Sequence, residues 1–262
     1  MEEKDSTLMK IALISDVHSN WHALKNVMKS IEENKCDKIH CLGDVVGYGP
    51  QPKKCWDLVQ KKCEIILTGN HEECVCLPFQ EQKINHFAAE GVRFSRKNLT
   101  DDDIKKMNDL PELKTVDSIG LTLCHGTFTS PSNWNYVLNI YDAKWELEKI
   151  PTMICAIGHT HKPVITSLSK SGEIKEYRGG ELIEMNLDLN NKYLINVGSV
   201  GQPRDKDPRS CYFILDYLIK DNKIKKITCE MKRIPYDISE TVKEMDNFSL
   251  SERTSRRLIK GT

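Results

Sequence analysis

Five short apolar runs, each ending in a glycine or a polar side chain, constrain the fold of this chain most strongly. The runs are IALISD (11–16), KIHCLGD (38–44), EIILTGN (64–70), LTLCHG (121–126) and MICAIGH (153–159). Strands that are buried on both faces carry continuous apolar runs of this kind. Open α/β sheets place their sites at the carboxyl ends of such strands. We therefore expect the polar side chains that end these runs to converge at one edge.

The polar side chains at and just after these strand ends have the chemistry of metal ligands. They are carboxylates, imidazoles and an amide: Asp16, His18, Asp44, Asn70, His125, His159 and His161. Such nitrogen and oxygen donors suit manganese, iron, zinc or nickel better than metals that need soft or purely oxygen ligands. Two four-coordinate ions need about eight ligand bonds, which seven side chains supply if one carboxylate bridges both ions.

Local spacing also predicts how the paired ligands lie. Side chains alternate between the two faces of an extended segment, so Asp16 and His18 are expected on one side, and so are His159 and His161. The glycines next to the ligands allow the backbone to turn sharply there.

Composition limits the partners of the chain. At 262 residues it is long enough to bury a sizeable core and fits one large α/β domain. Its 38 basic and 38 acidic residues give no electrostatic reason to expect a nucleic-acid partner or an anionic membrane. No run reaches the 18 apolar residues of a membrane-spanning helix. A homo-oligomer stays open.

The number of cysteines, ten, would suit disulfides, but their placement points to a reducing compartment. Cys41, Cys124 and Cys155 stand inside apolar runs, where a free thiol packs as a small hydrophobe. The polar N-terminal stretch lacks the order of a secretory signal, so we expect a cytoplasmic protein. Cys74 and Cys76 follow the candidate site closely, and a redox or extra-metal role stays open for them beside ordinary packing.

Periodicity between the runs predicts helices on the outside of a β sandwich. One helix is expected to about residue 34 after a cap at Ser19 or Asn20, and Pro52 suits the first turn of another. Further helices are expected at 80–98 and 101–109, in a lid-like insertion over about 80–110, and at 237–262 on the periphery. The expected later β segments are a hairpin at 113–124, a looser one within 170–191, and strands at 163–169, 181–187, 192–198, 210–216 and 223–234.

The ligand motifs, in their order, resemble the pattern of the calcineurin-like metallophosphoesterases, which is DxH, GD, GNH, a lone H and GHxH. Here the elements are Asp16-Val17-His18, Gly43-Asp44, Gly69-Asn70-His71, His125 and Gly158-His159-Thr160-His161. The segments 195–216 and 233–237 are similar to one branch of this superfamily, the small prokaryotic-type predicted phosphodiesterases.

The resemblance implies a fold and a division of labour. The fold would be a single domain over 1–262, a four-layer α/β/β/α sandwich with two mixed β-sheets and a dinuclear metal site at the carboxyl ends of the strands. One ion, manganese by preference, would be held by Asp16, His18 and His161, the other by Asn70, His125 and His159, with Asp44 as the bridge. His71 would protonate the leaving oxygen while water or hydroxide on the metals attacks phosphorus.

One departure from the superfamily bears on the substrate. The protein phosphatases of the superfamily carry the motif GDxVDRG, whose arginine binds phosphate. This chain, which resembles the superfamily elsewhere, has GDVVGYGP at 43–50. This favours a small phosphodiester or nucleotide over a phosphoprotein, with a protein or phosphomonoester phosphatase as the alternative. Arg204 is the candidate substrate-binding residue, because arginine forks suit phosphate. Arg93 is expected to be an ordinary surface arginine.

A second hypothesis is a non-catalytic interaction or scaffold module on the same fold, because some relatives of this kind have lost ligands. This chain keeps every ligand and His71, which favours an enzyme. Three other histidines, His22, His40 and His86, are expected to pack without binding metal. Tyr48, Trp134 and Tyr136 either stack a base or an aryl group or simply pack. The late basic residues are expected on a solvated helix face or a frayed tail; they are Arg253, Arg256, Arg257 and Lys260.

Overall fold

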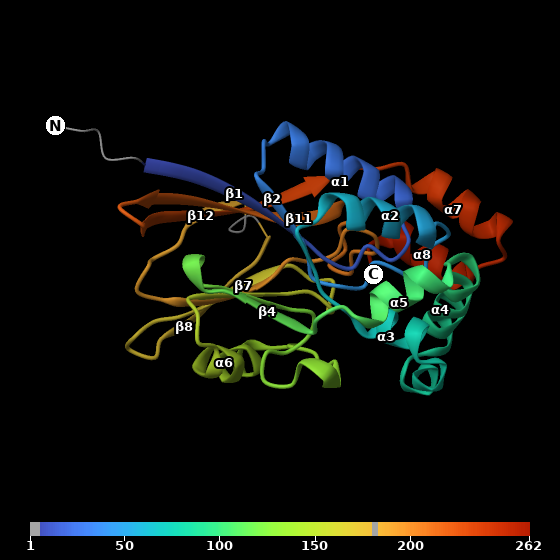
Figure 1. Cartoon of the computed structure of the whole chain (residues 1–262), viewed down its shortest axis with the longest axis horizontal. Helices are drawn as coiled ribbons and strands as arrows, with labels where there is room; N and C mark the ends of the chain where they lie inside the picture. Colours follow the sequence, from blue (N-terminus) through green and yellow to red (C-terminus); the bar gives the residue numbers. More distant parts are fainter. Residues whose placement is uncertain (1–5, 180–182) are drawn as a thin grey trace.

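Two six-stranded mixed sheets stack face to face in the computed structural model, which describes residues 6–179 and 183–262 (Figure 1). The first sheet has the strand order β3 (Ile65–Ile66), β2 (Lys38–Cys41), β1 (Ser6–Ile14), β11 (Ser210–Lys220), β12 (Lys223–Ile234) and β9 (Glu184–Asn186). The second has the order β4 (Leu113–Val116), β5 (Leu121–Cys124), β6 (Ile154–Ile157), β10 (Lys192–Asn196), β7 (Val164–Leu168) and β8 (Ile174–Tyr177).

Helices cover the outer faces of both sheets. In Figure 1, α1 (Trp21–Glu33) and α2 (Pro52–Lys62) lie over the first sheet, and α6 (Ile140–Lys149) lies under the second. The side chain of Asn20 caps α1 by accepting a hydrogen bond from the Ala23 N–H, and Pro52 stands in the first turn of α2 as expected. The predicted four-layer α/β/β/α sandwich is confirmed.

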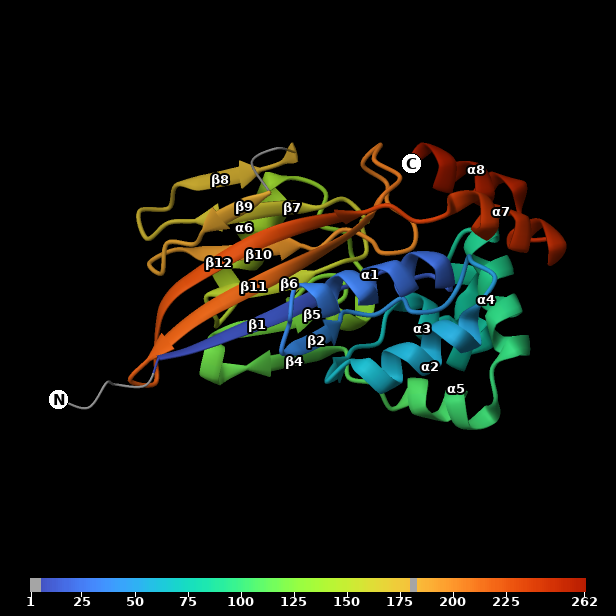
Figure 2. The same cartoon turned by 90° about the horizontal axis from the view of Figure 1, so that it is seen from above.

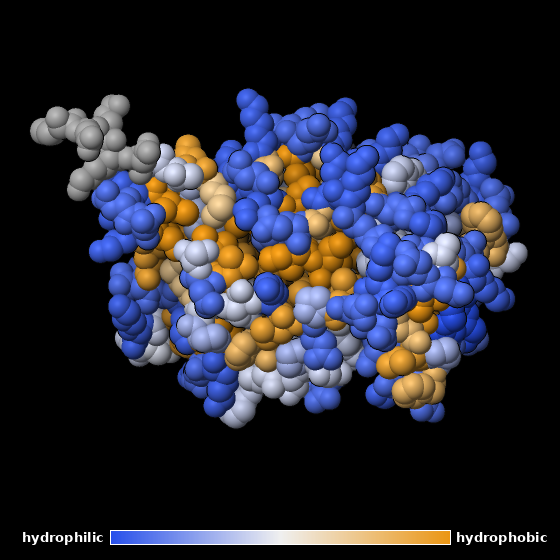
Figure 3. Space-filling model, in the orientation of Figure 1, coloured by the Kyte–Doolittle hydropathy of each residue, from blue (hydrophilic) through white to orange (hydrophobic). Residues whose placement is uncertain are grey.

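The continuous apolar runs have a direct structural reason. Ile11 and Leu13 of β1 point into the core between the two sheets, while Ala12 and Ile14 point into the core under α1 and α2. In β6 the same alternation sends Ile154 and Ala156 between the sheets, and Cys155 and Ile157 toward α6. Both faces of these strands are therefore buried, which is why the runs do not alternate with polar residues. Figure 3 shows apolar side chains between the hydrophilic surfaces of the outer layers.

Several short helices gather at one end of the sandwich. They are α3 (Asn70–Cys76), η1 (Pro78–Lys83), α4 (His86–Asn98), α5 (Asp101–Asn108), α7 (Ile238–Asn247) and α8 (Glu252–Lys260). Seen from above, α7 and α8 lie beside α4 at this end, although they come from the opposite end of the chain (Figure 2). None of the helices in the described part of the chain is long and apolar enough to cross a membrane.

The structure corrects four expected elements. The apolar run at 64–70 forms only the two-residue strand β3, and Asn70 already begins helix α3. The helix expected at 80–98 is broken, because Asn85 caps a new helix there by accepting from the Ala88 N–H. The polar segment 170–191 contains a regular strand, β8, that pairs with β7. The strand expected at 181–187 is the shorter β9, and residues 181 and 182 lie outside the described residues.

The remaining expected elements are present within a few residues of their predicted bounds. The hairpin at 113–124 is β4 and β5, joined through the single turn η2 (Asp117–Ile119). A further turn, η3 (Pro131–Asn133), precedes α6. The helices α4 and α5 fall in the expected insertion over about 80–110, and the assignment of 1–262 to one domain stays a prediction.

Candidate metal centre

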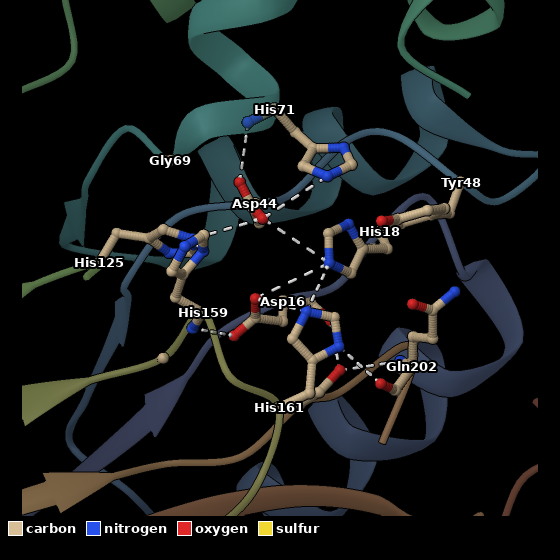
Figure 4. A network of polar contacts seen from close by, with 12 residues as sticks. Asp16, His18, Asp44, Tyr48, Gly69, His71, His125, His159, His161 and Gln202 are labelled. Carbon is tan, nitrogen blue, oxygen red and sulfur yellow. Dashed lines mark hydrogen bonds and ion pairs between the residues drawn. The ribbon is translucent and has the colours of Figure 1, made fainter. Parts of the chain in front are cut away.

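Six of the seven side chains proposed as ligands lie close together (Figure 4), and the seventh, Asn70, lines the same pocket as Asp44 and His159. They follow the carboxyl ends of β1, β2, β5 and β6, except Asn70, which is the first residue of α3. Strands β1 and β2 are parallel in the first sheet, and β5 and β6 are parallel in the second. Both sheets therefore deliver their strand ends, and the side chains that follow them, to the same place.

The potential ligand atoms form a continuous cluster. Asp16, His18 and His161 present atoms within 4.8 Å of one another, and so do Asp44, His125 and His159. The closest contacts between a carboxylate and an imidazole are 3.1 Å between His161 Nε2 and Asp16 Oδ1, and 3.3 Å between His125 Nε2 and Asp44 Oδ2. Asp44 Oδ2 also lies 3.7 Å from His18 Nε2, so this one carboxylate adjoins both groups.

Each of the four histidines proposed as ligands points its other ring nitrogen at a main-chain carbonyl. The contacts are His18 Nδ1 with Val46 O (3.2 Å), His125 Nδ1 with Leu42 O (2.9 Å), His159 Nε2 with Trp134 O (2.9 Å) and His161 Nδ1 with Gln202 O (2.6 Å). A nitrogen that donates to a carbonyl carries the ring hydrogen, so the opposite nitrogen is left with its lone pair. This arrangement is typical of histidines that bind metals.

The donor set fits divalent cations. The nitrogens opposite the carbonyl contacts face each other at 3.1 Å, in His18 with His161 and in His125 with His159. Two lone pairs at this distance repel unless a positive charge lies nearby. The side-chain oxygen of Asn70 is also buried and has no hydrogen-bond partner among the described residues. Metal ions would satisfy all of these atoms.

Burial and charge set the protonation of the site. Burial lowers the pKa of His159 to about 3 and keeps that ring neutral. Burial alone would raise the pKa of Asp44, but the imidazoles of His125 and His71 hold it well below its usual range. Burial opposes protonation of His125, yet the Asp44 carboxylate raises the pKa of His125 to about 10. A metal ion that binds His125 takes the place of this proton.

The backbone at the ligands is left-handed, which corrects the expectation of extended segments. The φ angles are +54° at Asp16, +47° at His18, +52° at Asp44, +65° at His159 and +61° at His161. Asp16 and His18, and likewise His159 and His161, do come together, but through these turns. Such conformations cost roughly 1–3 kcal/mol each and cluster at functional sites. Hydrogen bonds hold them: the Asp16 N–H donates to Gly43 O at 3.1 Å, and the His18 N–H to Asp44 O at 2.9 Å.

His71 differs from the four histidines above. It lies in the first turn of α3, and its Nε2 is 3.9 Å from Asp44 Oδ2. Its Nδ1 is buried without a hydrogen-bond partner among the described residues, so no carbonyl fixes its ring hydrogen. The main-chain N–H of His71 donates to Asp44 Oδ1 at 3.0 Å. The ring is therefore next to the cluster, and its backbone orients the carboxylate that adjoins both groups.

Glu72 has a role that we did not derive from the sequence. Its buried carboxylate accepts hydrogen bonds from the main-chain N–H groups of Asp44 (2.8 Å), Val46 (3.0 Å) and Gly69 (2.9 Å). It thereby ties the loop after β2 to the start of α3. The only feature of the sequence that could have pointed to this role is the position of Glu72 directly after His71. The carbonyls of Leu42, Val46, Trp134 and Gln202 gave no signal, because main-chain groups do not depend on residue type.

A cleft opens over the cluster. Asp44, Asn70, His71, His159 and His161 line its floor. Its walls include Tyr48, Lys83, Asn85, Trp134, Tyr136 and Arg204. The Tyr136 ring stacks on His159 at 4.0 Å, and the Arg204 guanidinium donates to Gln202 Oε1 at 2.7 Å. Arg204 therefore reaches the cleft, and so do the three aromatic residues singled out in the sequence.

The remaining candidate residues are a surface arginine, three histidines away from the cleft and two cysteines. Arg93 is paired with Glu81 on the surface at 3.0 Å, as an ordinary helix arginine would be. His22, His40 and His86 do not line the cleft. Cys74 lines it, but burial raises the pKa of its thiol, and that of Cys76, to about 12. Burial therefore disfavours the thiolate form of both residues.

Comparison with solved structures indicates the class of protein. A metallophosphoesterase from Sphaerobacter thermophilus is similar over 98% of this chain and 100% of that chain, with a TM-score of 0.79 and 29% identity. A hypothetical protein from Pyrococcus horikoshii shares the fold, with a TM-score of 0.73 over 97% of this chain and 99% of that chain at 15% identity. The chain therefore has the fold of the small prokaryotic-type metallophosphoesterases, as its sequence predicts.

Sequence comparison identifies the family. The family model described as the calcineurin-like phosphoesterase superfamily domain matches residues 9–219. An uncharacterized protein of Methanocaldococcus jannaschii is 32% identical over 254 residues, which are 96% of this chain and 98% of that protein. The chain belongs to the calcineurin-like phosphoesterase superfamily. It is a metal-dependent hydrolase of phosphoric esters, so the expectation of an enzyme is confirmed.

Proposed function

We propose that this protein is a dinuclear metal-dependent phosphodiesterase that acts on a small phosphodiester or a nucleotide. The observation that carries the proposal is the pair of ligand groups that meet at Asp44, with histidine lone pairs directed into both. Asp16, His18 and His161 would hold one ion, and Asn70, His125 and His159 the other. Manganese suits this mixture of imidazole, carboxylate and amide donors, and iron, zinc or nickel are the alternatives.

The chemistry of the ions and that of the chain are separate contributions. Two bound divalent ions would act as Lewis acids on the phosphate and lower the pKa of an attacking water. The chain orients the scissile phosphate over the cleft floor. His71 would donate a proton from Nε2, which faces the cluster, to the departing oxygen. The left-handed turns and the carbonyl contacts hold the ligands in place before the substrate arrives.

The absence of the phosphatase arginine supports a diester substrate. In the segment 43–50, glycine and tyrosine occupy the two positions at which the protein phosphatases of the superfamily carry Asp-Arg. A monoester dianion demands more fixed positive charge than a diester monoanion. Arg204 lines the cleft and is the residue that would bind phosphate in its place. Its position also favours the second candidate, a phosphomonoesterase in which Arg204 substitutes for the missing arginine.

The deciding experiment compares two substrates in two proteins. Wild-type protein loaded with manganese should hydrolyse bis-p-nitrophenyl phosphate at least as well as a phosphoserine peptide. Arg204→Ala should weaken both reactions without reversing their order. If wild-type protein strongly prefers the peptide, and Arg204→Ala loses that preference, the enzyme is a monoesterase that uses Arg204 as its phosphate clamp.

We also propose a cytoplasmic location. All ten cysteines are free in the structure, which supports a reducing compartment.

A further inference from the structure

Helix α4 holds the main chain at Tyr48 in one fixed conformation. Tyr48 has a left-handed φ of +52°, which few residues other than glycine adopt. The helix comes so close that a Cβ on Gly91 would lie 2.1 Å from the Tyr48 main-chain nitrogen. The preceding residue is also tied to α4, because the Gly47 N–H donates to Ser95 Oγ at 3.0 Å. The direction in which the Tyr48 side chain leaves the loop is therefore fixed.

The ring of Tyr48 packs against two histidines of the site. Its centre is 4.8 Å from the centre of the His18 ring and 4.8 Å from that of the His71 ring (Figure 4). Tyr48 is only 6% exposed, yet it lines the cleft together with His71 and Asn85. It is therefore a buried residue that still reaches the cleft beside the proposed proton donor.

The hydroxyl hydrogen of Tyr48 has no acceptor within residues 6–179 and 183–262. The hydrogen-bond partner of the hydroxyl there is Asn85 Nδ2, which donates to it at 3.5 Å. The amide of Asn85 is held in this orientation, because its Oδ1 caps α4 by accepting from the Ala88 N–H at 3.0 Å. A hydroxyl can accept and donate at the same time. The Tyr48 hydroxyl is therefore still able to donate to a ligand in the cleft.

A phosphate oxygen is the acceptor that suits this donor. A proton donor must lie within hydrogen-bond reach of the leaving oxygen, so a phosphate served by His71 lies next to the Tyr48 ring. Its non-bridging oxygens are charged and form stronger hydrogen bonds than neutral acceptors do. A hydroxyl is a neutral donor. It stabilises the monoanion of a diester without adding the fixed positive charge that a monoester dianion favours.

We propose that the hydroxyl of Tyr48 donates a hydrogen bond to one non-bridging oxygen of the scissile phosphate, and that the Asn85 amide directs this hydrogen into the cleft. Tyr48 is then a substrate-binding residue, and Asn85 is a positioning residue. The proposal rests on the phosphodiesterase function given above and adds the group that binds one particular oxygen of the substrate. The sequence alone left stacking and simple packing open for Tyr48, and neither role needs its hydroxyl.

Removing the hydroxyl alone tests the role of Tyr48. Tyr48→Phe keeps the ring that packs against His18 and His71, so both metal ions should stay bound. It should lower kcat/KM of the manganese-loaded protein for thymidine 5′-(p-nitrophenyl phosphate) roughly tenfold, as expected for the loss of a hydrogen bond to a charged group. Tyr141→Phe is the matched control, because it removes the hydroxyl of an exposed tyrosine on α6 and should change neither quantity. An unchanged kcat/KM in Tyr48→Phe would overturn the proposal.

Sulfur substitution identifies the oxygen that is bound. The two phosphorothioate diastereomers of this ester carry sulfur in place of one or the other non-bridging oxygen, and sulfur accepts hydrogen bonds weakly. With one diastereomer Tyr48→Phe should lower kcat/KM less than about twofold, because the hydrogen bond is already lost, and with the other it should keep the roughly tenfold effect. A tyrosine that only packs against the histidines would give the same loss with both diastereomers, and that result would refute the hydrogen bond.

Asn85→Asp tests the positioning role. Aspartate caps a helix about as well as asparagine does, so α4 should be retained. Its second oxygen is an acceptor, however, and would take the hydroxyl hydrogen away from the substrate. The loss of kcat/KM should be roughly tenfold larger in the wild-type background than in Tyr48→Phe, which has no hydroxyl to capture. A loss of the same size in both backgrounds would mean that the new charge acts on the substrate directly, and the role of Asn85 would be wrong.

Direct binding separates this proposal from the proposed function. If wild-type protein does not hydrolyse the ester, the phosphodiesterase assignment is wrong, and the intact ester then serves as the ligand for calorimetry on manganese-loaded protein. Tyr48→Phe should raise its Kd roughly tenfold, and Tyr141→Phe should leave it unchanged. Equal Kd values for wild type and Tyr48→Phe, or no binding to wild-type protein, would contradict a hydrogen bond from Tyr48 to the phosphate.

Discussion

At the residue scale, the second nitrogen of each histidine distinguishes a metal ligand from a proton donor. His18, His125, His159 and His161 each have one nitrogen directed at a main-chain carbonyl. His71 has no such contact, and its Nδ1 has no partner in the described part of the chain. The four are therefore fixed in one tautomer, whereas the proton on His71 is free to move. This difference supports the roles proposed for them.

Replacing His71 should separate catalysis from metal binding. His71→Ala should lower kcat by roughly 10²–10⁴-fold, the usual contribution of a general acid, while both metal ions stay bound. Asp44→Asn should instead lower metal content and activity together, because it removes the charge shared by both ligand groups. Metal analysis and kcat for a diester with a poor leaving group measure the two effects. Loss of an ion from His71→Ala would contradict the assignment.

Gly47 holds the space in which the His71 ring lies. Its φ is +89°, and a Cβ on it would stand 1.9 Å from His71 Nδ1. Gly47→Ala should therefore displace the ring and lower kcat nearly as much as His71→Ala, with both metal ions retained. Gly172→Ala is the matched control, because Gly172 has φ +86° but open space around it. Both substitutions should destabilise the fold by roughly 1–2 kcal/mol, but an equal kcat in both would rule out this role for Gly47.

At the scale of elements, the sequence predicts the strands that carry repeated apolar runs, and it misses features that depend on the tertiary structure. The runs at 11–16 and 153–159 identify β1 and β6 because both faces of these strands are apolar. The left-handed turns at Asp16 and His18 have no such signal, since they are held by hydrogen bonds that their N–H groups donate to distant carbonyls. The docking of α8 is likewise invisible, because it depends on a contact between Gly261 and the loop after Arg204.

Helix α5 should show a pH-dependent cap. Thr100 donates to the Asp103 carboxylate from its N–H at 2.9 Å and from its hydroxyl at 2.7 Å. Burial alone would raise the pKa of Asp103, but these hydrogen bonds and the charge of Lys53 lower it overall. A carboxyl whose pKa is lowered in the folded state stabilises the fold at pH values above its unfolded-state pKa of about 3.9. This contribution is lost as the pH falls through the folded-state pKa.

Asp103→Asn should therefore reduce the free energy of unfolding by roughly 1 kcal/mol at pH 7, and the deficit should shrink as the pH falls below about 4. Urea unfolding of both proteins at pH 7 and at a pH below about 4 measures how the difference in the free energy of unfolding changes. Asp102→Asn is the control in the same helical turn, because Asp102 is exposed and, among the residues that the structure describes, forms an ion pair only with Lys106. A deficit that is the same at both pH values would mean that the Asp103 charge does not contribute.

At the scale of the whole molecule, the metal centre joins parts of the chain that are far apart in sequence. His18 and His161 meet although they are 143 positions apart, and the ligands follow strands of both sheets. The order of the motifs predicted this convergence, because strands buried on both faces deliver their carboxyl ends to a shared edge. If the proposed ions bind there, the energetic consequence is that they bind only when both sheets and the core between them are assembled.

Metal should therefore stabilise the entire fold and not only the loops around the site. A ligand that binds only the folded state at a concentration one hundred times its Kd adds about 2.7 kcal/mol to the free energy of unfolding. Manganese added to chelator-treated wild-type protein should produce a gain of about this size in urea unfolding followed by circular dichroism. His71→Ala should keep the gain and Asp44→Asn should lose most of it, while Asp102→Asn, far from the ligands in sequence, should behave as wild type. An equal gain in Asp44→Asn would place the stabilising ions somewhere other than the site at the strand ends.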